Sequence, residues 1–494
     1  MLTNLTKKIT YPVLAAALAF GCTPDQEQIT PTTTMNAEAT SALLDGSENS
    51  SVRFKSNDYI IISSSSSLPA DLEGQIKSLN GKITGQMKKV GIATVSSTDA
   101  DFAEKARKIK GVSSVIRDVE IQWYNPESFK TAEVDATNIN PASTGDSNPF
   151  FAFQWGATAI QAPAAWNTGA RGKGVKVAVL DSGFHLDHPD LKDNIIYSKS
   201  FVPGETVRPV GTGFSHGTHV AGTIAAADNN LGVIGIAPEA SLILLKVLGD
   251  SGSGSFGWMM EGIMHAVEQE ADVINMSLGA YLPRNGKYLD ENGNVINDTK
   301  ATQELLVAIT RVTNYATQQG VTIISSAGNS AIDGNSDKSG ISIPAGMPNV
   351  ISISSTAPSG WAANLLGADL DGVASYTNYG TPDVTFAAPG GDSRYPGNEN
   401  GVIAGLVRPV WVFDMILSTG TATSYNWVAG TSMASPHAAG VAALIIGQNG
   451  GKMHPKQVEA AMRASADDLG KTGRDPYYGY GRVNAFKAVT ATIQ

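Results

Sequence analysis

The sequence predicts an α/β protein with a doubly wound, mostly parallel sheet, preceded by a small ferredoxin-like α+β domain. Two observations predict this fold. After residue 150, short runs rich in valine and isoleucine alternate with helical patterns, which indicates parallel strands that are buried on both faces. Before residue 124, the patterns follow the order strand, helix, strand, strand, helix, strand, which is the split ferredoxin-like motif.

The composition excludes several classes of protein. The 494 residues carry a net charge of −10, which disfavours binding to the phosphates of a nucleic acid. Hydrophobic residues make up 42% of the chain and charged residues 16%, a balance that favours a folded core over a disordered chain. The single cysteine excludes an intrachain disulfide framework and a cysteine-based zinc site.

Residues 1–21 have the pattern of an export signal. Lys7 and Lys8 precede an apolar run at 11–21 that is too short to span a membrane, and this run ends at Cys22. The arrangement resembles the signal of bacterial lipoproteins, in which the cysteine carries lipid, although Ala19 stands where that family usually has leucine. The resemblance implies an exported chain anchored through lipid on Cys22 to a bacterial envelope membrane or cell surface. Ordinary secretion is the alternative.

The remaining chain divides into a tether, a small domain, a linker and a large domain. Residues 22–53 are polar and lack periodicity, as a flexible tether would. The small domain is expected at 54–123, and residues 124–149, with three prolines, are expected to be a linker. The large domain would occupy residues 150–494.

The large domain alternates strand and helix patterns. Strands are expected at 175–180, 241–247, 271–276, 321–326 and 350–354, and helices near 216–227, 257–269, 301–319 and 431–448. Residues 281–300 and 391–410 are polar or rich in glycine and proline, which predicts insertions on the surface.

Four polar residues follow expected strands or begin expected helices. Asp181 and Asn329 each follow an apolar strand, whereas His216 and Ser432 stand near the starts of helices. The carboxyl ends of parallel strands meet at one edge of a sheet, where functional groups collect. Taken alone, each residue has an ordinary structural explanation as a turn residue, a helix cap or a buried histidine.

The segments around these residues resemble the motifs of the subtilisin-like serine proteases, the subtilases. They are Val-Leu-Asp-Ser-Gly at 179–183, His-Gly-Thr-His-Val-Ala-Gly-Thr at 216–223, Asn-Met-Ser-Leu-Gly at 275–279, Ala-Gly-Asn at 327–329, Ala-Ala-Pro-Gly at 387–390 and Gly-Thr-Ser-Met-Ala-Ser-Pro-His at 430–437. Six segments in this order are not expected by chance, and the order Asp, His, Ser is that of subtilisin. The resemblance covers most of residues 150–494 and implies a serine endopeptidase without a catalytic cofactor.

The resemblance implies a role for each of the four polar residues. Ser432 would attack the peptide carbonyl, because a hydroxyl at a helix N-terminus is exposed and faces a positive dipole. His216 would accept the proton and pass it to the leaving amine, and Asp181 would hold the imidazole in the required tautomer. The side-chain amide of Asn329 would stabilise the oxyanion together with the backbone N–H of Ser432.

The same resemblance implies two chain segments that bind an extended peptide or protein substrate by strand addition. The expected substrate-binding residues are Gly252, Ser253, Gly254, Phe256, Ser277, Leu278 and Gly279. The glycines would let the substrate backbone approach closely, and Phe256 would line an apolar pocket. The primary pocket shows no obvious charged residue, which favours uncharged side chains before the cleaved bond.

A structural calcium ion is also implied by the resemblance, because residues 227–233 are similar to the calcium loop of many subtilases. The implied ligands are the side chains of Asp190 and Asn229 and the backbone carbonyls of Ala227, Leu231 and Val233. All of them are the oxygen donors that calcium prefers. A loop without metal is the alternative.

The small domain at 54–123 resembles the subtilase pro-domain in its pattern and its position before the protease. The resemblance implies an intramolecular inhibitor and folding aid, in a precursor that cuts itself between residues 123 and 150. An independent binding module is the alternative.

Two other functions compete with this interpretation. The pairs His185 with His188 and His216 with His219 have a spacing that suits a metal-dependent hydrolase, but neither is the His-Glu-x-x-His zinc motif. That reading also leaves the serine and asparagine motifs unexplained. An inactive protease scaffold that only binds peptides is disfavoured, because all four chemical positions are filled.

Overall fold

The large domain is built around an eight-stranded sheet in the order β17-β16-β14-β10-β6-β8-β7, with β18 also paired to β16. The computed structural model describes residues 52–126, 129–134, 148–290 and 292–491. The strands of this sheet are β6 (Lys176–Asp181), β7 (Ile195–Ser200), β8 (Ser241–Lys246), β10 (Val273–Met276), β14 (Thr322–Ser326), β16 (Val350–Ala357), β17 (Gly372–Val373) and β18 (Phe386–Pro389). Every pair is parallel except β16 with β17, which confirms the predicted fold class.

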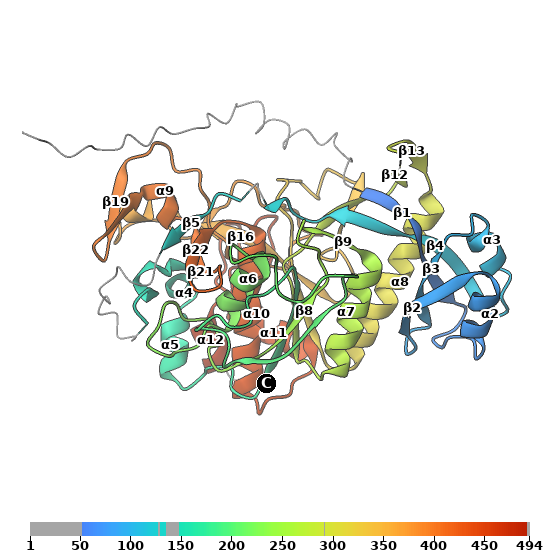
Figure 1. The fold of residues 1–494 in the computed structure, drawn as a ribbon. Coiled ribbons are helices and arrows are strands. Elements are labelled where there is room, and N and C mark those ends of the chain that lie inside the picture. Colours follow the sequence, from blue (N-terminus) through green and yellow to red (C-terminus); the bar gives the residue numbers. More distant parts are fainter. Residues whose placement is uncertain (1–51, 127–128, 135–147, 291, 492–494) are drawn as a thin grey trace, which may run out of the picture. The chain divides into compact units, whose positions relative to one another are not determined.

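Helices cover both faces of this sheet (Figure 1). The long helices are α6 (His216–Ala225), α7 (Phe256–Glu268), α8 (Thr299–Gln318) and α10 (Thr431–Gln448). Val177 and Val179 of β6 belong to the apolar cluster that includes α6 and α10, whereas Ala178 and Leu180 belong to the cluster that includes α7 and α8. Successive strand residues point to opposite faces, so a strand covered on both sides must be apolar throughout.

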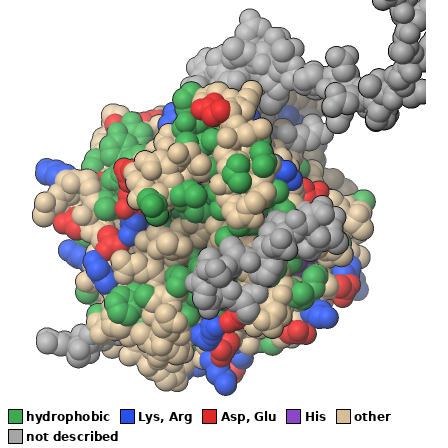
Figure 2. All heavy atoms as spheres, turned by 90° about the vertical axis from the view of Figure 1, so that its left-hand side faces the viewer, with side chains coloured by type: hydrophobic (Ala, Val, Ile, Leu, Met, Phe, Trp, Pro, Cys, Tyr) green, Lys and Arg blue, Asp and Glu red, His purple; other side chains and the backbone are tan. Residues whose placement is uncertain are grey.

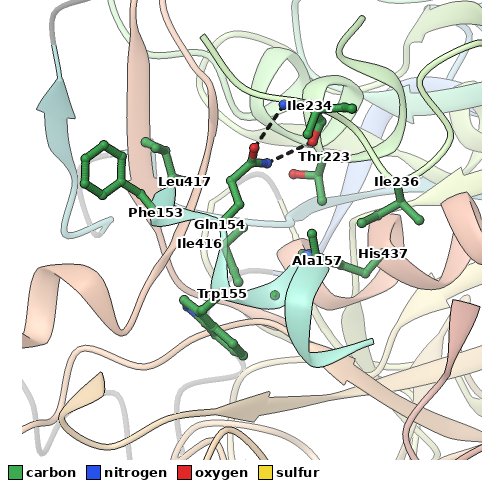
Figure 3. Close-up of a pocket in the computed structure, with 11 residues that line it drawn as sticks. Phe153, Gln154, Trp155, Ala157, Thr223, Ile234, Ile236, Ile416, Leu417 and His437 are labelled. Carbon is green, nitrogen blue, oxygen red and sulfur yellow. Dashed lines mark hydrogen bonds between the residues drawn. The ribbon is translucent and has the colours of Figure 1, made fainter. Parts of the chain in front are cut away.

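Shorter helices complete the large domain. They are η4 (Phe151–Phe153), α4 (Trp155–Ala159), α5 (Ala162–Asn167), η5 (Trp361–Ala363), α9 (Val410–Phe413), α11 (Pro455–Ser465) and α12 (Ala485–Thr490). The Gln154 side chain, just before α4, donates to the carbonyl of Ile234 and accepts from its N–H, both at 2.9 Å (Figure 3). The pocket beside these groups holds about 10 Å³ and is lined by His437 rather than by His216, so it is packing space and not a ligand site.

The N-terminal domain, blue in Figure 1, has the expected ferredoxin-like sheet order β4-β1-β3-β2 with antiparallel neighbours. Its elements are β1 (Val52–Ser63), α2 (Leu72–Ser78), β2 (Gly81–Met87), β3 (Ile92–Ser97), α3 (Phe102–Ala106) and β4 (Val112–Gln122). The first strand begins at Val52, two residues before the expected start of the domain. The predicted signal peptide, Cys22 and nearly all of the tether lie outside the described residues.

The two faces of the N-terminal sheet have different partners. Tyr59 and Ile61 pack with α2 and α3, whereas Ile60 and Ile62 belong to the same apolar cluster as Met260 of α7. The N-terminal domain therefore shares a core with the large domain, and all described residues belong to one compact unit.

Three segments expected to be insertions or linker contain strands. β11 (Ala280–Pro283) pairs with β15 (Gly340–Ile343), and the hairpin of β12 (Lys287–Leu289) and β13 (Val295–Asn297) joins the N-terminal sheet. The second insertion contains the hairpin of β19 (Asn400–Ile403) and β20 (Leu406–Pro409). In the expected linker, β5 (Ala132–Val134) pairs with β22 (Tyr425–Val428), which pairs with β21 (Ile416–Thr419). Polar segments can form these strands because an edge pairing needs main-chain groups rather than a two-sided apolar surface.

The face of the molecule nearest β19 carries scattered hydrophobic side chains among interspersed basic and acidic ones (Figure 2). Leu366 is fully exposed, and Val402 and Val407 on the β19–β20 hairpin are about half exposed. Among the residues that the structure describes, no helix is both long and apolar enough to cross a membrane.

Candidate active site

Asp181 and His216 meet at the carboxyl edge of the large sheet. Asp181 is the last residue of β6 and His216 the first of α6, and Asp181 Oδ1 lies 2.8 Å from His216 Nδ1. Both side chains are fully buried. Ser215 caps α6 by accepting a hydrogen bond from the N–H of Thr218 at 3.2 Å, which fixes where the helix, and hence His216, begins.

Ser432 and Asn329 lie at the start of α10. Ser432 is the second residue of that helix, and its Oγ donates to the carbonyl of Ser277 at 3.3 Å. Asn329 Oδ1 accepts from the N–H and the hydroxyl of Thr431 at 2.9 and 2.7 Å. Because its carbonyl oxygen is held in this way, the amide N–H₂ of Asn329 is the group left to donate beside Ser432.

Two aromatic side chains cover His216 in the uncut chain. Tyr124 stacks on the imidazole with a centroid distance of 4.7 Å and an interplanar angle of 20°, and Phe129 lies 5.4 Å away. His216 Nε2 is buried and makes no hydrogen bond to the part of the chain that the structure describes. The serine hydroxyl therefore turns to a backbone carbonyl while the histidine is covered by residues of the expected linker.

The first predicted substrate-binding segment pairs with an extended strand. β9 (Ser253–Ser255) is antiparallel to β4, with Ile121 opposite Gly254, and the N–H of Trp123 donates to the carbonyl of Gly252 at 3.1 Å. Gly252 has φ = +81°, and a Cβ there would lie 2.2 Å from the carbonyl oxygen of Tyr124. Only glycine satisfies both the positive φ and the close approach.

Phe256 and the second predicted segment have different surroundings. Phe256 is buried and meets the Trp123 ring edge to face at 5.4 Å, while Trp123 Nε1 donates to the carbonyl of Gly254 at 3.0 Å. The second segment, residues 277–279, lies beside Ser432, and Ser277 Oγ donates to the Ser432 carbonyl at 2.7 Å. Within the described residues this segment pairs with no strand of the N-terminal domain, so only the first edge holds the extended chain.

Comparisons with known proteins decide the family. A family profile described as "Subtilase family" matches residues 172–481. This chain belongs to the subtilase family. Subtilisin NAT of Bacillus subtilis subsp. natto is 36% identical over 333 residues, which are 67% of this chain and 69% of that protein. Thermitase of Thermoactinomyces vulgaris is 33% identical over 345 residues, which are 69% of this chain and 98% of that protein.

Solved structures agree with the subtilase fold. The epidermin leader peptide processing serine protease of Staphylococcus aureus has a TM-score of 0.66, is 23% identical, and covers 88% of this chain and 97% of its own. A lanthipeptide protease has a TM-score of 0.53, is 30% identical, and covers 68% of this chain and 94% of its own. Residues 148–494 make up about 70% of the chain, so the 88% coverage takes in part of the N-terminal domain as well. Family and fold together make this chain a subtilisin-type serine endopeptidase.

The loop predicted to bind calcium, residues 227–233, brings part of the predicted ligand set together. The carbonyls of Ala227 and Val233 converge on one point, because both accept from the side-chain nitrogen of Asn148, at 3.1 and 2.6 Å. Asp190 Oδ1 is buried without a hydrogen-bond partner, and burial raises the pKa of this carboxyl to about 6. A buried carboxylate oxygen without a partner and two converging carbonyls are oxygen donors of the kind that calcium takes, so these residues fit the ion.

Two features of the predicted calcium site were not expected, one within the loop and one outside it. Asn229 Oδ1 accepts from the N–H of Leu231 at 3.0 Å, which ties this predicted ligand into its own loop. Asn148 was missed, and its amide nitrogen lies where a cation would bind. Asn148 Oδ1 accepts from the N–H of Asn230 at 3.3 Å, so Asn148 would present an oxygen to an ion only if its amide turned over and gave up that hydrogen bond. Its place just before the large domain is the only sequence signal that could have indicated it.

The histidine pairs do not form a metal centre. The Nε2 atoms of His185, His188 and His219 face backbone carbonyls, those of Gly213, Ser424 and Ile416. Burial lowers the pKa of His188 to about 4 and that of His219 to about 3, so both are neutral near pH 7. The part of the chain that the structure describes holds no group of three or more acidic, histidine or cysteine side chains able to bind a metal. His185, His188 and His219 are therefore structural residues.

Proposed function

We propose that this subtilase is made as an exported precursor whose N-terminal domain blocks the active site until the chain cuts itself. The observation that carries the proposal is the path of residues 120–124, which extend along β9 and place Tyr124 on His216. A peptide substrate would use the same main-chain edge, because strand addition depends on backbone groups rather than on one sequence. The N-terminal domain thus holds its own chain where a substrate belongs.

The proposed chemistry is acyl transfer through Ser432. Once Tyr124 and Phe129 leave, rotation about the Ser432 Cα–Cβ bond would turn Oγ from the Ser277 carbonyl toward His216 Nε2. Oγ would then attack the peptide carbonyl carbon while its proton passes to Nε2. The C–N bond breaks as Nε2 gives that proton to the amine, and water hydrolyses the acyl ester by the same proton route.

Asp181 and Asn329 would stabilise the charges that develop in this reaction. The 2.8 Å contact between Asp181 Oδ1 and His216 Nδ1 supports a role for the aspartate in orienting the imidazole and stabilising the imidazolium. The free amide donor of Asn329 and the backbone N–H of Ser432 would stabilise the oxyanion. No cofactor takes part in these steps.

Contacts across the shared core support the roles of inhibitor and folding aid. Asp118 accepts from the N–H of Gly257 at the start of α7, at 3.2 Å, and Thr94 donates to Glu261 of the same helix at 2.5 Å. Arg311 of α8 donates to the carbonyl of Ser63 at 3.0 Å. A small sheet that orders two helices of a large parallel sheet would lower the barrier to its non-local pairing.

Two further parts of the proposal concern anchoring and metal. Cys22 would carry the lipid that holds the exported chain at a bacterial membrane, because it directly follows the apolar signal. Calcium would be held by Asp190, the carbonyls of Ala227, Leu231 and Val233, and Asn148 or Asn229. The ion would cross-link the loop after α6 and so stabilise the fold without taking part in the reaction.

Mass spectrometry of the exported chain tests the proposal directly. The wild-type chain should end up cut between residues 123 and 150, with lipid mass on the fragment that begins at Cys22. The Ser432→Ala variant should stay uncut and lose peptide hydrolysis by several orders of magnitude, because the nucleophile has been removed. A cut Ser432→Ala chain, or one with more than about a tenth of wild-type activity, would disprove the assignment.

A further inference from the structure

The hairpin of β12 and β13 belongs to the protease part of the chain, yet it extends the sheet of the N-terminal domain. It lies between β11 and α8 in sequence, and Leu289 of β12 pairs in parallel with Arg53 of β1. Figure 1 shows the hairpin beside the start of β1. In this sheet β1 and β4 lie between the hairpin and β9, with Arg53 opposite Glu120 and Glu120 opposite Ser255. The hairpin is therefore a second attachment of the N-terminal domain, in addition to the pairing of β4 with β9.

One aromatic side chain joins the hairpin to both of its neighbours. Tyr288 is 1% exposed, and its ring lies 4.4 Å from that of Phe54 on β1. The Tyr288 hydroxyl is 2.5 Å from that of Thr302 on α8. Tyr288 thus connects the N-terminal domain to the protease through a ring contact on one side and a hydrogen bond on the other.

A cavity adjoins this contact near the start of α8. It holds about 350 Å³ and is lined by residues of both domains, among them Phe54, Arg117 and Glu304. The cavity leaves part of this boundary unfilled. Around it, the pairing of β12 with β1, the Phe54–Tyr288 contact and a hydrogen bond from Ser114 to Glu304 of α8 hold the N-terminal domain to the protease. Without the N-terminal domain, β12 would be an edge strand with an uncovered tyrosine, which proteins usually avoid.

We propose that the hairpin is a clamp that retains the N-terminal domain after the chain has been cut, a role that rests on the proposed self-processing. Its partner is the protein's own cleaved N-terminal fragment, recognised by strand addition at Arg53 and by the ring of Phe54. Because this fragment begins at Cys22, retention also keeps the mature protease attached to whatever holds Cys22.

The test measures how fast the cleaved fragment leaves. The full-length enzyme is allowed to cut itself, then inactivated with a serine-directed fluorophosphonate, and the bound fragment is followed by size exclusion over time. Tyr288→Ala and Phe54→Ala should each speed dissociation about tenfold or more, as loss of a buried interfacial aromatic does. Val295→Ala, at a 62% exposed position on the same hairpin, is the matched control and should change the rate less than twofold.

The outcomes separate the clamp from the proposed function. Normal cutting with wild-type retention in both aromatic variants would overturn the clamp, provided that each cut enzyme hydrolyses a short peptide like wild type before inactivation. A wild-type chain that is never cut would overturn self-processing instead. In that case, hydrogen exchange of the uncut chain decides: faster exchange at residues 52–55 in Tyr288→Ala supports the hairpin as the holding element, and unchanged exchange overturns it.

Discussion

Raising the pH should loosen the hold of the N-terminal domain on the protease, because Asp118 is buried where the two meet. Its Oδ1 accepts from the N–H groups of Val119 and Gly257, at 2.8 and 3.2 Å. Desolvation by burial outweighs these hydrogen bonds and the attraction of Lys55, and it raises the pKa of Asp118 from 3.8 to about 6. Once the domain leaves, the carboxyl is exposed and its pKa returns to the ordinary value.

The sign and size of the effect follow from the two pKa values. The complex binds the proton more tightly than the separated domain, so association is strongest below pH 3.8 and weakens as the pH rises through about 6. Relative to strongly acidic solution, the titration of Asp118 lowers the association constant of the N-terminal domain about 15-fold at pH 5 and about 150-fold at pH 7.5. Between these two conditions Asp118 alone therefore accounts for about a tenfold change.

The assay is the dissociation rate of the cut, fluorophosphonate-inactivated complex at pH 5 and pH 7.5, since most affinity differences appear in this rate. Burial also raises the pKa of Glu261 at the same boundary. The dissociation rate of the wild-type complex should therefore rise at least tenfold from pH 5 to pH 7.5. The asparagine in Asp118→Asn cannot titrate, so the ratio of the dissociation rates at pH 7.5 and pH 5 should be about tenfold smaller in this variant than in wild type. The control Glu73→Gln, on the exposed side of α2, should behave like wild type. A full pH effect retained in Asp118→Asn would refute this reasoning.

Two other predictions concern the protease itself. Asn329→Ala should lower kcat by about 100-fold or more with little change in KM, because the amide stabilises a charge that exists only in the transition state. The magnitude is that of such a donor in subtilisin, a relative of this chain. A rise in KM alone would contradict the oxyanion role. Removing calcium with a chelator should lower the Tm of the mature enzyme, and added calcium should restore it, because an ion that binds only the native state stabilises it by mass action. A melting curve indifferent to both treatments would contradict the calcium site.

Much of the fold and of the catalytic edge could be predicted from the sequence, because the signals are local. A strand covered on both faces must be apolar at every position, and β6 shows this pattern up to Asp181. Helix starts have their own signals, such as the Ser215 cap before His216. Parallel strands bring their carboxyl ends to one edge, so Asp181 and His216 were expected to meet, and they lie 2.8 Å apart.

Only the tertiary structure decided which segments pair across long sequence separations. The polar segment 281–300 was expected to be a surface insertion, yet Leu289 pairs with Arg53 and Tyr288 covers Phe54. Likewise, no local pattern places Tyr124 on His216 or the Asn148 amide between two carbonyls of the calcium loop. Edge pairing uses main-chain groups, which do not depend on the side-chain pattern. An aromatic ring can pack on any apolar surface that the fold brings next to it. Such contacts therefore leave no periodic signal in the sequence and arise when the packed core brings the segments together.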